Sequence, residues 1–290
     1  MKEFPIPVLA VGFGPGSQTE EDTLAYLPMP QGMETFRPPV LPEPEEVLHC
    51  QQGKRALREA LAQLDLVRHG AGNLGVDLGG LPAADLKLIN QVLGEGEVSA
   101  LVQGSEPGGY TLRVQESVFP GVWRVVASVN GVVSSDTIEL GAVPQALKAA
   151  AQEDVSDTVP RWQGALPPNV QNAPTLLSEI EDQWRIWRAG QPAHVVNLTL
   201  LPMSSEDIAF LDHHLGTGRV LILSRGYGNC RITNTRMPNC WRVVYYNSQD
   251  LVILNTVEVV ELPDVAQAAQ EDLDESHDRL AEVLAWVEGA

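Results

Sequence analysis

The chain contains Leu93-Gly94-Glu95-Gly96-Glu97-Val98, and the same stretch returns as Leu215-Gly216-Thr217-Gly218-Arg219-Val220. Each occurrence follows a segment whose apolar residues recur with the period of a helix, and it precedes several strand-like runs rich in β-branched residues. The similarity continues in both halves: Trp123-Arg124-Val125-Val126 matches Trp241-Arg242-Val243-Val244, Thr137-Ile138-Glu139 matches Thr256-Val257-Glu258, and Arg113 matches Arg231. Self-similarity of this kind predicts an internal duplication of one structural unit.

Each copy has the same predicted order of elements: a helix, a short strand, a second helix and four strands. The first copy is expected to have helices at 54–69 and 85–93, and strands at 76–78, 98–103, 110–117, 123–129 and 132–140. The second copy is expected to have helices at 177–187 and 204–215, and strands at 195–200, 220–224, 230–236, 241–246 and 251–259. The sequence therefore predicts an α+β fold with a mostly antiparallel sheet, its two tandem copies packed as a pseudo-dimer.

The predicted domain boundaries follow the two copies and the composition between them. Residues 1–50 form an N-terminal arm whose many Pro and Gly residues forbid a long helix. The first copy covers 51–150, a Pro-containing linker covers 151–174, and the second copy covers 175–290. The end of the second copy is predicted to be an acidic helix, which is either a solvated face or a surface for a basic peptide.

Length and composition bound the class of protein. The chain has 290 residues, 44% of them apolar, which is enough for a packed core. Its net charge of −19 argues against a general nucleic-acid or acidic-membrane binder, and no run reaches the roughly 20 apolar residues of a membrane helix. Three cysteines in such a chain favour reduced thiols. We therefore expect a cytoplasmic protein that binds no nucleic acid and does not insert into a membrane.

One segment of the second copy differs in character from the rest of the chain. Residues 224–231 read Ser-Arg-Gly-Tyr-Gly-Asn-Cys-Arg, and we call this segment the Gly-Tyr-Gly turn. Its two glycines flank Tyr227 and permit a positive φ and a close approach to a partner. From Arg219 to Arg242, both included, there are five arginines and no Asp or Glu. The segment is either a tight hairpin with solvated arginines or a recognition surface.

The duplication provides an internal control for these two interpretations. Residues that both copies share, such as the Trp-Arg-Val-Val runs, are expected to serve the fold. At the position of the Gly-Tyr-Gly turn, the first copy has the different sequence Gln103-Gly104-Ser105-Glu106-Pro107-Gly108-Gly109. The first copy also has Leu112 and Val122 where the second has Cys230 and Cys240. Features of the second copy alone are therefore candidates for function.

The two cysteines of the second copy suggest two kinds of chemistry. Cys230 and Cys240 have nine residues between them, unlike the close pairs of zinc ribbons, and two thiolates alone make an incomplete metal site. Structural thiols and a transient metal or iron–sulfur cluster site remain alternatives. Cys230 lies beside two arginines that favour a thiolate, but the sequence shows no accompanying His and Asn pattern of a nucleophile. We expect no enzyme activity and no resident cofactor.

Several segments together resemble one known family. The segments are Ser224-Arg225-Gly226-Tyr227-Gly228-Asn229-Cys230-Arg231-Ile232, Tyr246-Asn247-Ser248, Thr256-Val257-Glu258-Val259, Gly14-Pro15-Gly16-Ser17-Gln18, Leu27-Pro28-Met29-Pro30-Gln31-Gly32-Met33 and Leu41-Pro42-Glu43-Pro44-Glu45. They resemble the HupH/HyaF (HoxQ) family of hydrogenase expression/formation proteins, over nearly the whole chain. The second copy is identified as a HupH-type C-terminal region.

The resemblance implies a cytoplasmic accessory chaperone for the maturation and assembly of uptake [NiFe]-hydrogenase. It implies two partners, the iron–sulfur small-subunit precursor before export and a thioredoxin-like hydrogenase accessory protein, and it supplies no catalytic residues. The alternative function is a metal or Fe–S carrier that uses Cys230 and Cys240. The candidate partner-binding residues are Arg225, Gly226, Tyr227, Gly228, Asn229, Arg231, Trp241, Asn247, Met29, Gln31 and Met33.

Overall fold

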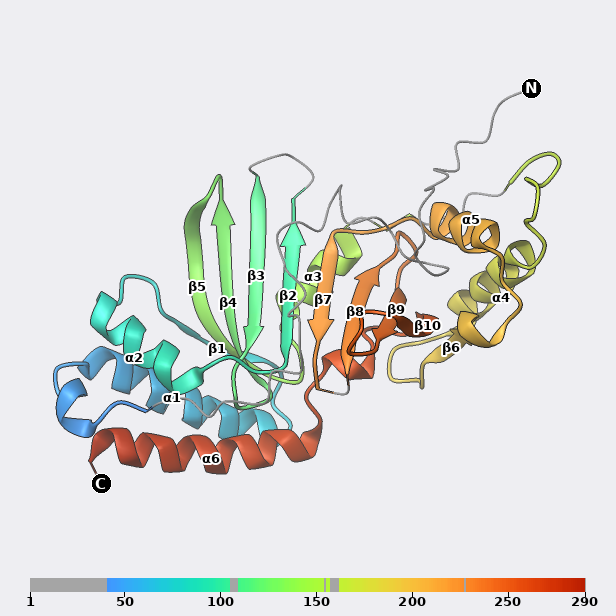
Figure 1. Ribbon diagram of the computed structural model, residues 1–290. Coiled ribbons are helices and arrows are strands. Elements are labelled where there is room, and N and C mark those ends of the chain that lie inside the picture. The colour runs from blue at the N-terminus through green and yellow to red at the C-terminus, as the bar shows by residue number, and fades with distance from the viewer. Residues whose placement is uncertain (1–40, 105–108, 154, 157–161, 227, 290) are drawn as a thin grey trace. The chain divides into compact units, whose positions relative to one another are not determined.

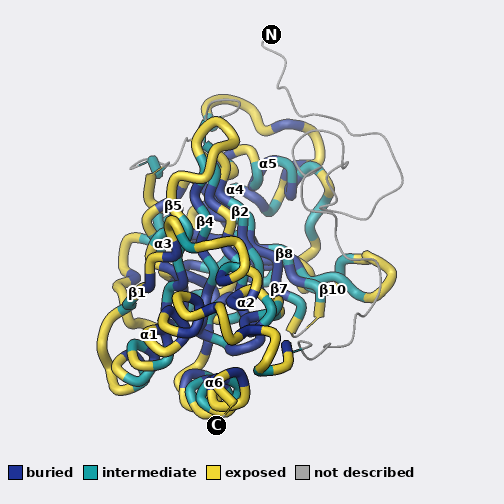
Figure 2. Tube along the Cα trace, turned by 90° about the vertical axis from the view of Figure 1, so that its left-hand side faces the viewer, coloured by how far each residue is buried: buried dark blue, intermediate teal, exposed yellow. Residues whose placement is uncertain are grey.

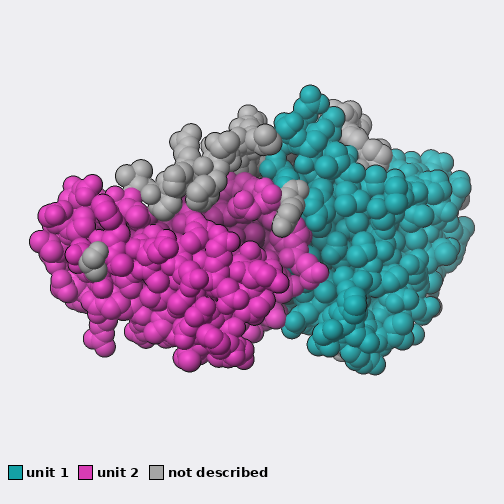
Figure 3. Space-filling model, turned by 90° about the horizontal axis from the view of Figure 1, so that it is seen from below, with its two compact units in different colours: residues 1–35, 151–218, 227–263 teal, residues 36–150, 219–226, 264–290 magenta. Residues whose placement is uncertain are grey.

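The computed structural model describes residues 41–104, 109–153, 155–156, 162–226 and 228–289. The chain divides into two compact units, which Figure 3 colours separately. Unit 1 comprises residues 1–35, 151–218 and 227–263, and unit 2 comprises residues 36–150, 219–226 and 264–290. Because unit 2 takes two segments from the second copy, the compact units interleave the two copies.

Unit 2 consists of helices and an antiparallel sheet (Figure 1). Its elements are η1 (Pro44–Val47), α1 (Gln51–Arg68), β1 (Leu74–Asp77), α2 (Ala83–Leu93), β2 (Val98–Gln103), β3 (Tyr110–Glu116), β4 (Val122–Val129), β5 (Val132–Leu140), β7 (Val220–Ser224), η3 (Asp264–Ala266) and α6 (Gln270–Glu288). The strand order in this sheet is β1-β5-β4-β3-β2-β7. Every strand pairs antiparallel with its neighbour.

Unit 1 has the same local order of helices and strands. Its elements are α4 (Ala173–Ile186), β6 (His194–Asn197), η2 (Leu198–Leu200), α5 (Ser205–Leu215), β8 (Asn229–Asn234), β9 (Cys240–Tyr246) and β10 (Val252–Val259). The strand order is β8-β9-β10-β6, again antiparallel. The predicted α+β class, the antiparallel sheet and the tandem order of elements are confirmed.

Several predicted elements begin or end a few residues from their observed bounds, and two further local features differ from the prediction. The strand predicted at 195–200 ends at Asn197, because the Asn197 side-chain oxygen accepts the backbone N–H groups of Thr199 and Leu200 and turns the chain into η2. Helix α3 (Gln145–Glu153) is additional to the predicted elements, and its signal was the helical spacing of apolar residues around Leu147 and Ala150.

The core of unit 2 joins α1, α2 and α6 to one face of the sheet. Leu57, Leu64 and Val67 form the buried stripe of α1, while Leu280 and Leu284 belong to the stripe of α6. The opposite side of α6 is exposed (Figure 2). This arrangement explains the predicted acidic helix, since its carboxylates lie on the solvated side while its apolar residues enter the core.

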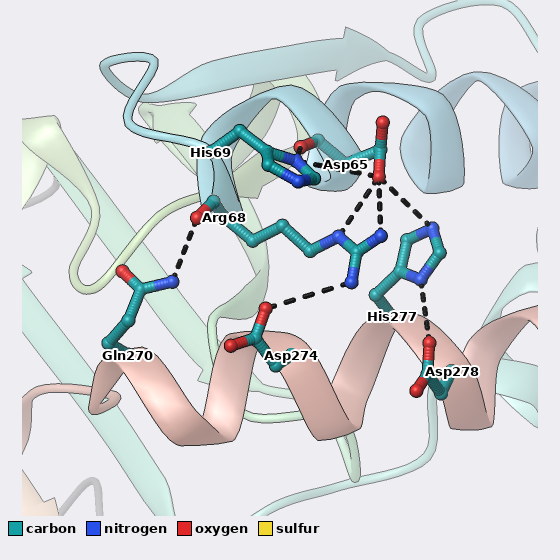
Figure 4. A network of polar contacts seen from close by, with 7 residues as sticks. All are labelled: Asp65, Arg68, His69, Gln270, Asp274, His277 and Asp278. Carbon is teal, nitrogen blue, oxygen red and sulfur yellow. Dashed lines mark hydrogen bonds and ion pairs between the residues drawn. The ribbon is translucent and has the colours of Figure 1, made fainter.

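Polar contacts hold both ends of α6 against α1. At one end the Gln270 side chain donates to the backbone oxygen of Arg68 (2.9 Å), and at the other the buried Lys54 ammonium donates to the backbone oxygen of Val287 (2.8 Å). The two helices therefore run antiparallel. Figure 4 shows the network near the first end, where Asp65 accepts from Arg68 and also lies 3.7 Å from His277 on α6.

The pairing of β2 with β7 has a local two-fold symmetry. These strands occupy the same position in the two copies, because Val98 and Val220 end the two matching stretches. They pair antiparallel with Ala100 opposite Ile222, and Val102 opposite Val220. A strand that pairs with its own repeat in this way makes an isologous contact, as the strands of a symmetric dimer do.

The glycines of the two matching stretches allow a close backbone approach. The N–H of Gly96 donates to the backbone oxygen of Glu116 (2.7 Å), and that of Gly218 to the backbone oxygen of Asn234 (2.8 Å). A Cβ atom on Gly96 would collide with the Ser117 carbonyl oxygen, and one on Gly218 with the Asn234 side chain. The Gly-x-Gly pattern is therefore a requirement of the fold in both copies.

A buried aspartate connects the two helices of each copy. Asp207 forms the predicted capping box of α5 with Ser204, and its Oδ1 also accepts the N–H groups of Gln171, Asn172 and Ala173 at the start of α4. In the first copy, Asp85 of α2 accepts the N–H of Gly53 in α1 (2.6 Å). In each copy, a carboxylate on the second helix thus accepts hydrogen bonds from N–H groups at the start of the first helix, where these groups have no partner within their own helix.

Candidate functional site

The first part of the Gly-Tyr-Gly turn lies against the first matching stretch, inside unit 2. The backbone N–H of Arg225 donates to the Glu97 carbonyl oxygen (3.1 Å), and the Arg225 guanidinium donates to the Gly96 carbonyl oxygen (3.3 Å). A Cβ atom on Gly226 would collide with the Glu97 carboxylate. Arg225 is partly buried, so part of its side chain contacts the protein and part is exposed to solvent.

The second part of the turn is open. Gly228 is exposed and has a φ of 102°, a conformation that favours glycine, and a Cβ atom there would meet nothing within 4 Å. Asn229 follows as the first residue of β8 and is half-buried. Tyr227 lies outside the described residues, as do Met29, Gln31 and Met33 of the arm. Gly226 and Gly228 are the exposed described residues of the predicted surface.

Two of the predicted partner-binding residues have local structural partners. Trp241 is 1% exposed and its indole N–H donates to the Glu261 carbonyl oxygen, just as the buried Trp123 donates to that of Gly141. Asn247 shapes the turn between β9 and β10, where its side-chain oxygen accepts the N–H groups of Gln249 and Leu251. The expectation that shared Trp residues serve the fold agrees with these positions.

The strand register separates the two cysteines of the second copy. Cys230 lies opposite Tyr245, whereas Cys240 is five residues further along β9, next to Thr235. At roughly 3.4 Å per residue the two positions are about 17 Å apart along the ladder, and the odd spacing places them on opposite faces. Among the described residues, no group of three or more His, Cys, Asp or Glu side chains is placed to hold a metal ion.

Burial governs the acidity of both thiols. Desolvation raises the pKa of Cys230 to about 12, partly opposed by a hydrogen bond with the Tyr245 side chain. Desolvation also raises the pKa of Cys240 to about 12, against the opposing effects of a hydrogen bond with Thr235 and the charge of Arg242. Both thiols are therefore protonated near neutral pH, unlike the low-pKa thiols of reactive nucleophiles.

The structure assembles a polar cluster that the sequence analysis did not identify as a unit. Arg231, Arg242 and Tyr246 share one face of the β8–β9 pair, and Asn255 of β10 lies on the same face. Asp212 on α5 lies over it, 3.7 Å from an Arg242 nitrogen. We call these five residues the second-copy arginine cluster. The guanidinium of Arg231 stacks over the Tyr246 ring at 5.7 Å from its centre.

The electrostatics of the cluster differ from those of isolated side chains. Desolvation raises the pKa of Asp212, and the charges of Arg242 and Arg231 oppose that shift. Desolvation also raises the pKa of the Tyr246 hydroxyl, again opposed by Arg231 and Arg242. The hydroxyl therefore stays protonated and remains a hydrogen-bond donor. The cluster combines two guanidinium groups with a single carboxylate.

The corresponding residues of the first copy form a complete ion pair. Arg124 donates from Nε and Nη2 to the two oxygens of Asp136, at 2.5 Å each, and from Nη1 to the Asn90 side chain at 3.0 Å. Asp136 precedes Thr137 as Asn255 precedes Thr256, so the strand carboxylate of the first copy is an amide in the second. On the helix, Asn90 lies three residues before Leu93, and Asp212 lies three residues before Leu215. The helix residue is therefore an amide in the first copy and a carboxylate in the second.

The exchange leaves polar atoms of the second copy without partners. Nη1 of Arg242 and Oδ1 of Asn255 are both buried and have no hydrogen-bond partner. The sequence contained the signal for this difference, because Asp136 and Asn255 lie directly before matched residues. The signal became interpretable only when the structure showed that Asp136 binds Arg124.

Comparisons with known proteins give a consistent result. The model of the HupH hydrogenase expression protein C-terminal conserved region matches residues 51–167 and again residues 170–287, so the region occurs in both copies.

The described part of the chain contains no helix that is long and apolar enough to cross a membrane.

Curated relatives match almost the full length. The hydrogenase expression/formation protein HoxQ of Cupriavidus necator is 52% identical over 290 residues, 99% of each chain. The hydrogenase expression/formation protein HupH of Rhodobacter capsulatus is 46% identical over 278 residues, 94% of this chain and 95% of the relative. The hydrogenase-1 operon protein HyaF of Escherichia coli is 34% identical over 278 residues, also 94% and 95%. A solved structure, the hydrogenase expression protein HupH from Thiobacillus denitrificans, is 25% identical with a TM-score of 0.37, and covers 39% of this chain and 95% of that chain.

Proposed function

The chain belongs to the HupH hydrogenase expression protein family, and from that premise we propose that it is an accessory chaperone in [NiFe]-hydrogenase maturation. In this proposal the client is the iron–sulfur small subunit of an uptake hydrogenase, held in the cytoplasm before its export. A thioredoxin-like accessory protein acts beside it. The proposal assigns the chain no catalytic turnover and no resident cofactor.

The observation that carries the proposal is the near full-length similarity to HoxQ, whose name describes expression or formation of a hydrogenase. The second copy supplies the surface that we assign to the client. Its Gly-Tyr-Gly turn combines an anchored Arg225 with an exposed, left-handed Gly228. The turn includes Asn229 and ends at Arg231, which is also a member of the second-copy arginine cluster. Binding residues are disproportionately found on loops that a folded scaffold positions, which favours this segment for recognition of another chain.

Wild-type protein is expected to recover the small-subunit precursor from hydrogenase-producing cells in a tagged pull-down. The double variant Arg225→Gln, Tyr227→Ser is expected to recover at least about five-fold less, because it removes two large side chains from the proposed contact. Loss of the Arg225 hydrogen bond to Gly96 should cost no more than about 1.5 kcal/mol of folding free energy.

The matched control is Arg113→Gln, which removes the exposed arginine of the first copy that corresponds to Arg231. It is expected to recover as much precursor as the wild type. Equal recovery by the double variant would remove the Gly-Tyr-Gly turn from the client surface. Failure of the wild type to recover the small subunit would contradict the chaperone proposal itself.

A further inference from the structure

Arg124 of the first copy and its equivalent in the second copy, Arg242, differ in their hydrogen-bond partners. In the first copy the Arg124 guanidinium is fully occupied, because Asp136 binds it with two oxygens and Asn90 accepts from its third nitrogen. Paired nitrogens of a guanidinium match the two oxygens of a carboxylate, so this is a favourable pair in a partly buried place. The first copy therefore contains its own carboxylate for this arginine.

In the second copy the same position lacks that carboxylate. Asn255 replaces it, is 5% exposed, and has a side-chain oxygen with no partner. Arg242 has an 11% exposed side chain and a buried nitrogen with no partner. The nearby carboxylate of Asp212 lies 3.7 Å from Arg242, beyond hydrogen-bond distance. Buried donors and acceptors without partners are costly, so the site is incomplete as the chain alone forms it.

The surroundings of this incomplete pair favour an anion. Arg231 and Arg242 bring two positive charges, Asp212 supplies one negative charge, and the Tyr246 hydroxyl is an additional donor. The face runs along the strands from Asn229 and Tyr246, next to the exposed Gly228, towards Arg242. The half-buried Arg231 lies between these ends. An anion from the partner would thus approach beside the turn that we assign to the client.

We propose that the second-copy arginine cluster binds a carboxylate of the client protein, an Asp or Glu side chain, in the place that Asp136 fills within the first copy. The inference rests on the proposed function, because it names the chemical group that the client contributes. The client carboxylate accepts hydrogen bonds from Arg242 and Arg231, and a rotation of the Asn255 amide that turns its Nδ2 towards the carboxylate adds a donor where an aspartate would repel it. In the first copy the carboxylate that pairs with the arginine comes from the same chain, and in the second copy it comes from the client.

The decisive variant is Asn255→Asp, which restores the internal carboxylate. It is expected to raise the unfolding temperature, because Arg242 gains the partner that Arg124 has, and to reduce recovery of the small-subunit precursor at least ten-fold. The matched variant Asp136→Asn is expected to lower the unfolding temperature and leave recovery unchanged. A merely structural role for the cluster would raise stability in Asn255→Asp without reducing recovery, and that result would overturn the proposal.

A second measurement is independent of the client. In the full-length ¹⁵N-labelled protein, sodium acetate is titrated against sodium chloride at equal ionic strength while the arginine Nε–Hε signals are followed. Signals assigned through Arg231→Lys and Arg242→Lys variants are expected to shift saturably with acetate, and the shift should be lost in Asn255→Asp. The Arg124 signal should not move. Absence of an acetate response in the wild type would show that water alone completes the site, and would overturn the proposal.

The two measurements separate the sources of failure. An acetate response with precursor recovery that Asn255→Asp does not change would show that the carboxylate is a free small molecule, contrary to the proposal. An acetate response in a protein that recovers no small subunit at all would support the carboxylate site while removing the proposed function.

Discussion

Replacing Asp207 with alanine is expected to lower the free energy of unfolding by about 3–4 kcal/mol, because one buried carboxylate serves several backbone donors. Its Oδ1 accepts the N–H groups of Gln171 (2.8 Å), Asn172 (2.9 Å) and Ala173 (2.9 Å), and the residue is 1% exposed. Burial alone would raise the pKa of Asp207, but the hydrogen bonds from Ala173 and the other backbone donors outweigh it and lower the pKa. Urea unfolding measures the loss.

The pH dependence of the Asp207 contribution has a definite sign. A carboxyl group whose pKa is lower in the folded state stabilises the fold above its unfolded pKa of about 4, and the stabilisation disappears as the pH falls through the folded value. The difference between wild type and Asp207→Asn should therefore shrink on acidification below about pH 4. Asp182→Ala, at an exposed position of α4, is the control and should change stability by less than about 0.5 kcal/mol. An Asp207→Ala protein as stable as this control would contradict the role in helix capping.

Replacing Glu116 with glutamine is expected to have the opposite sign, stabilising the protein by about 2–3 kcal/mol at pH 8. Glu116 is 5% exposed, and desolvation raises its pKa to about 7 despite hydrogen bonds from the Val98 and Gly121 backbones. Because the folded pKa lies above the ordinary value of 4.5, the contribution of Glu116 to stability is most favourable below pH 4.5 and becomes less favourable as the pH rises towards 7.

The second copy shows that a neutral amide fits at this position. Asn234 lies opposite Trp241 as Glu116 lies opposite Trp123, and its side chain donates to the Ala151 carbonyl oxygen. Thermal unfolding at a series of pH values measures the effect, with the exposed Glu95→Gln as the control. Wild type and Glu116→Gln should be about equally stable near pH 4.5 and diverge above it. Parallel stability curves across that range would show that the pKa of Glu116 is the same in the folded and unfolded states, contrary to the prediction.

These predictions bear on function through the division of roles between the copies. Shared devices such as the capping aspartates and the Gly-x-Gly approach maintain the fold in both copies. The unshared features, the Gly-Tyr-Gly turn and the second-copy arginine cluster, lie along one path from Gly228 to Arg242. Duplication allows this separation, because one copy retains a complete ion pair while its equivalent in the other is, in our proposal, the binding site for a partner.

Apart from α3 and the short 3-10 helices, the type and order of the elements followed from the sequence alone. Apolar periodicity, the Ser204–Asp207 capping box and the repeated Gly-x-Gly stretch are local signals, because each depends on backbone geometry within a few residues. Comparing the copies predicted that Trp241 serves the fold together with Trp123, whereas its place among the candidate partner-binding residues stays a prediction. The resemblance to the HupH family was equally visible, since it rests on residues in linear order. These features could be predicted without any knowledge of contacts between residues distant in the chain.

Only the tertiary structure decided which segments pack together. Equivalent helices and strands of the two copies have similar apolar faces, so periodicity does not determine that β7 and α6 of the second copy complete unit 2. The register of β8 with β9 separated Cys230 from Cys240, although the sequence left a shared site open. The meaning of the exchange from Asp136 to Asn255 likewise depended on a cross-strand contact with an arginine. Such contacts join residues distant in the chain, and their free energy depends on burial and geometry that no local pattern contains.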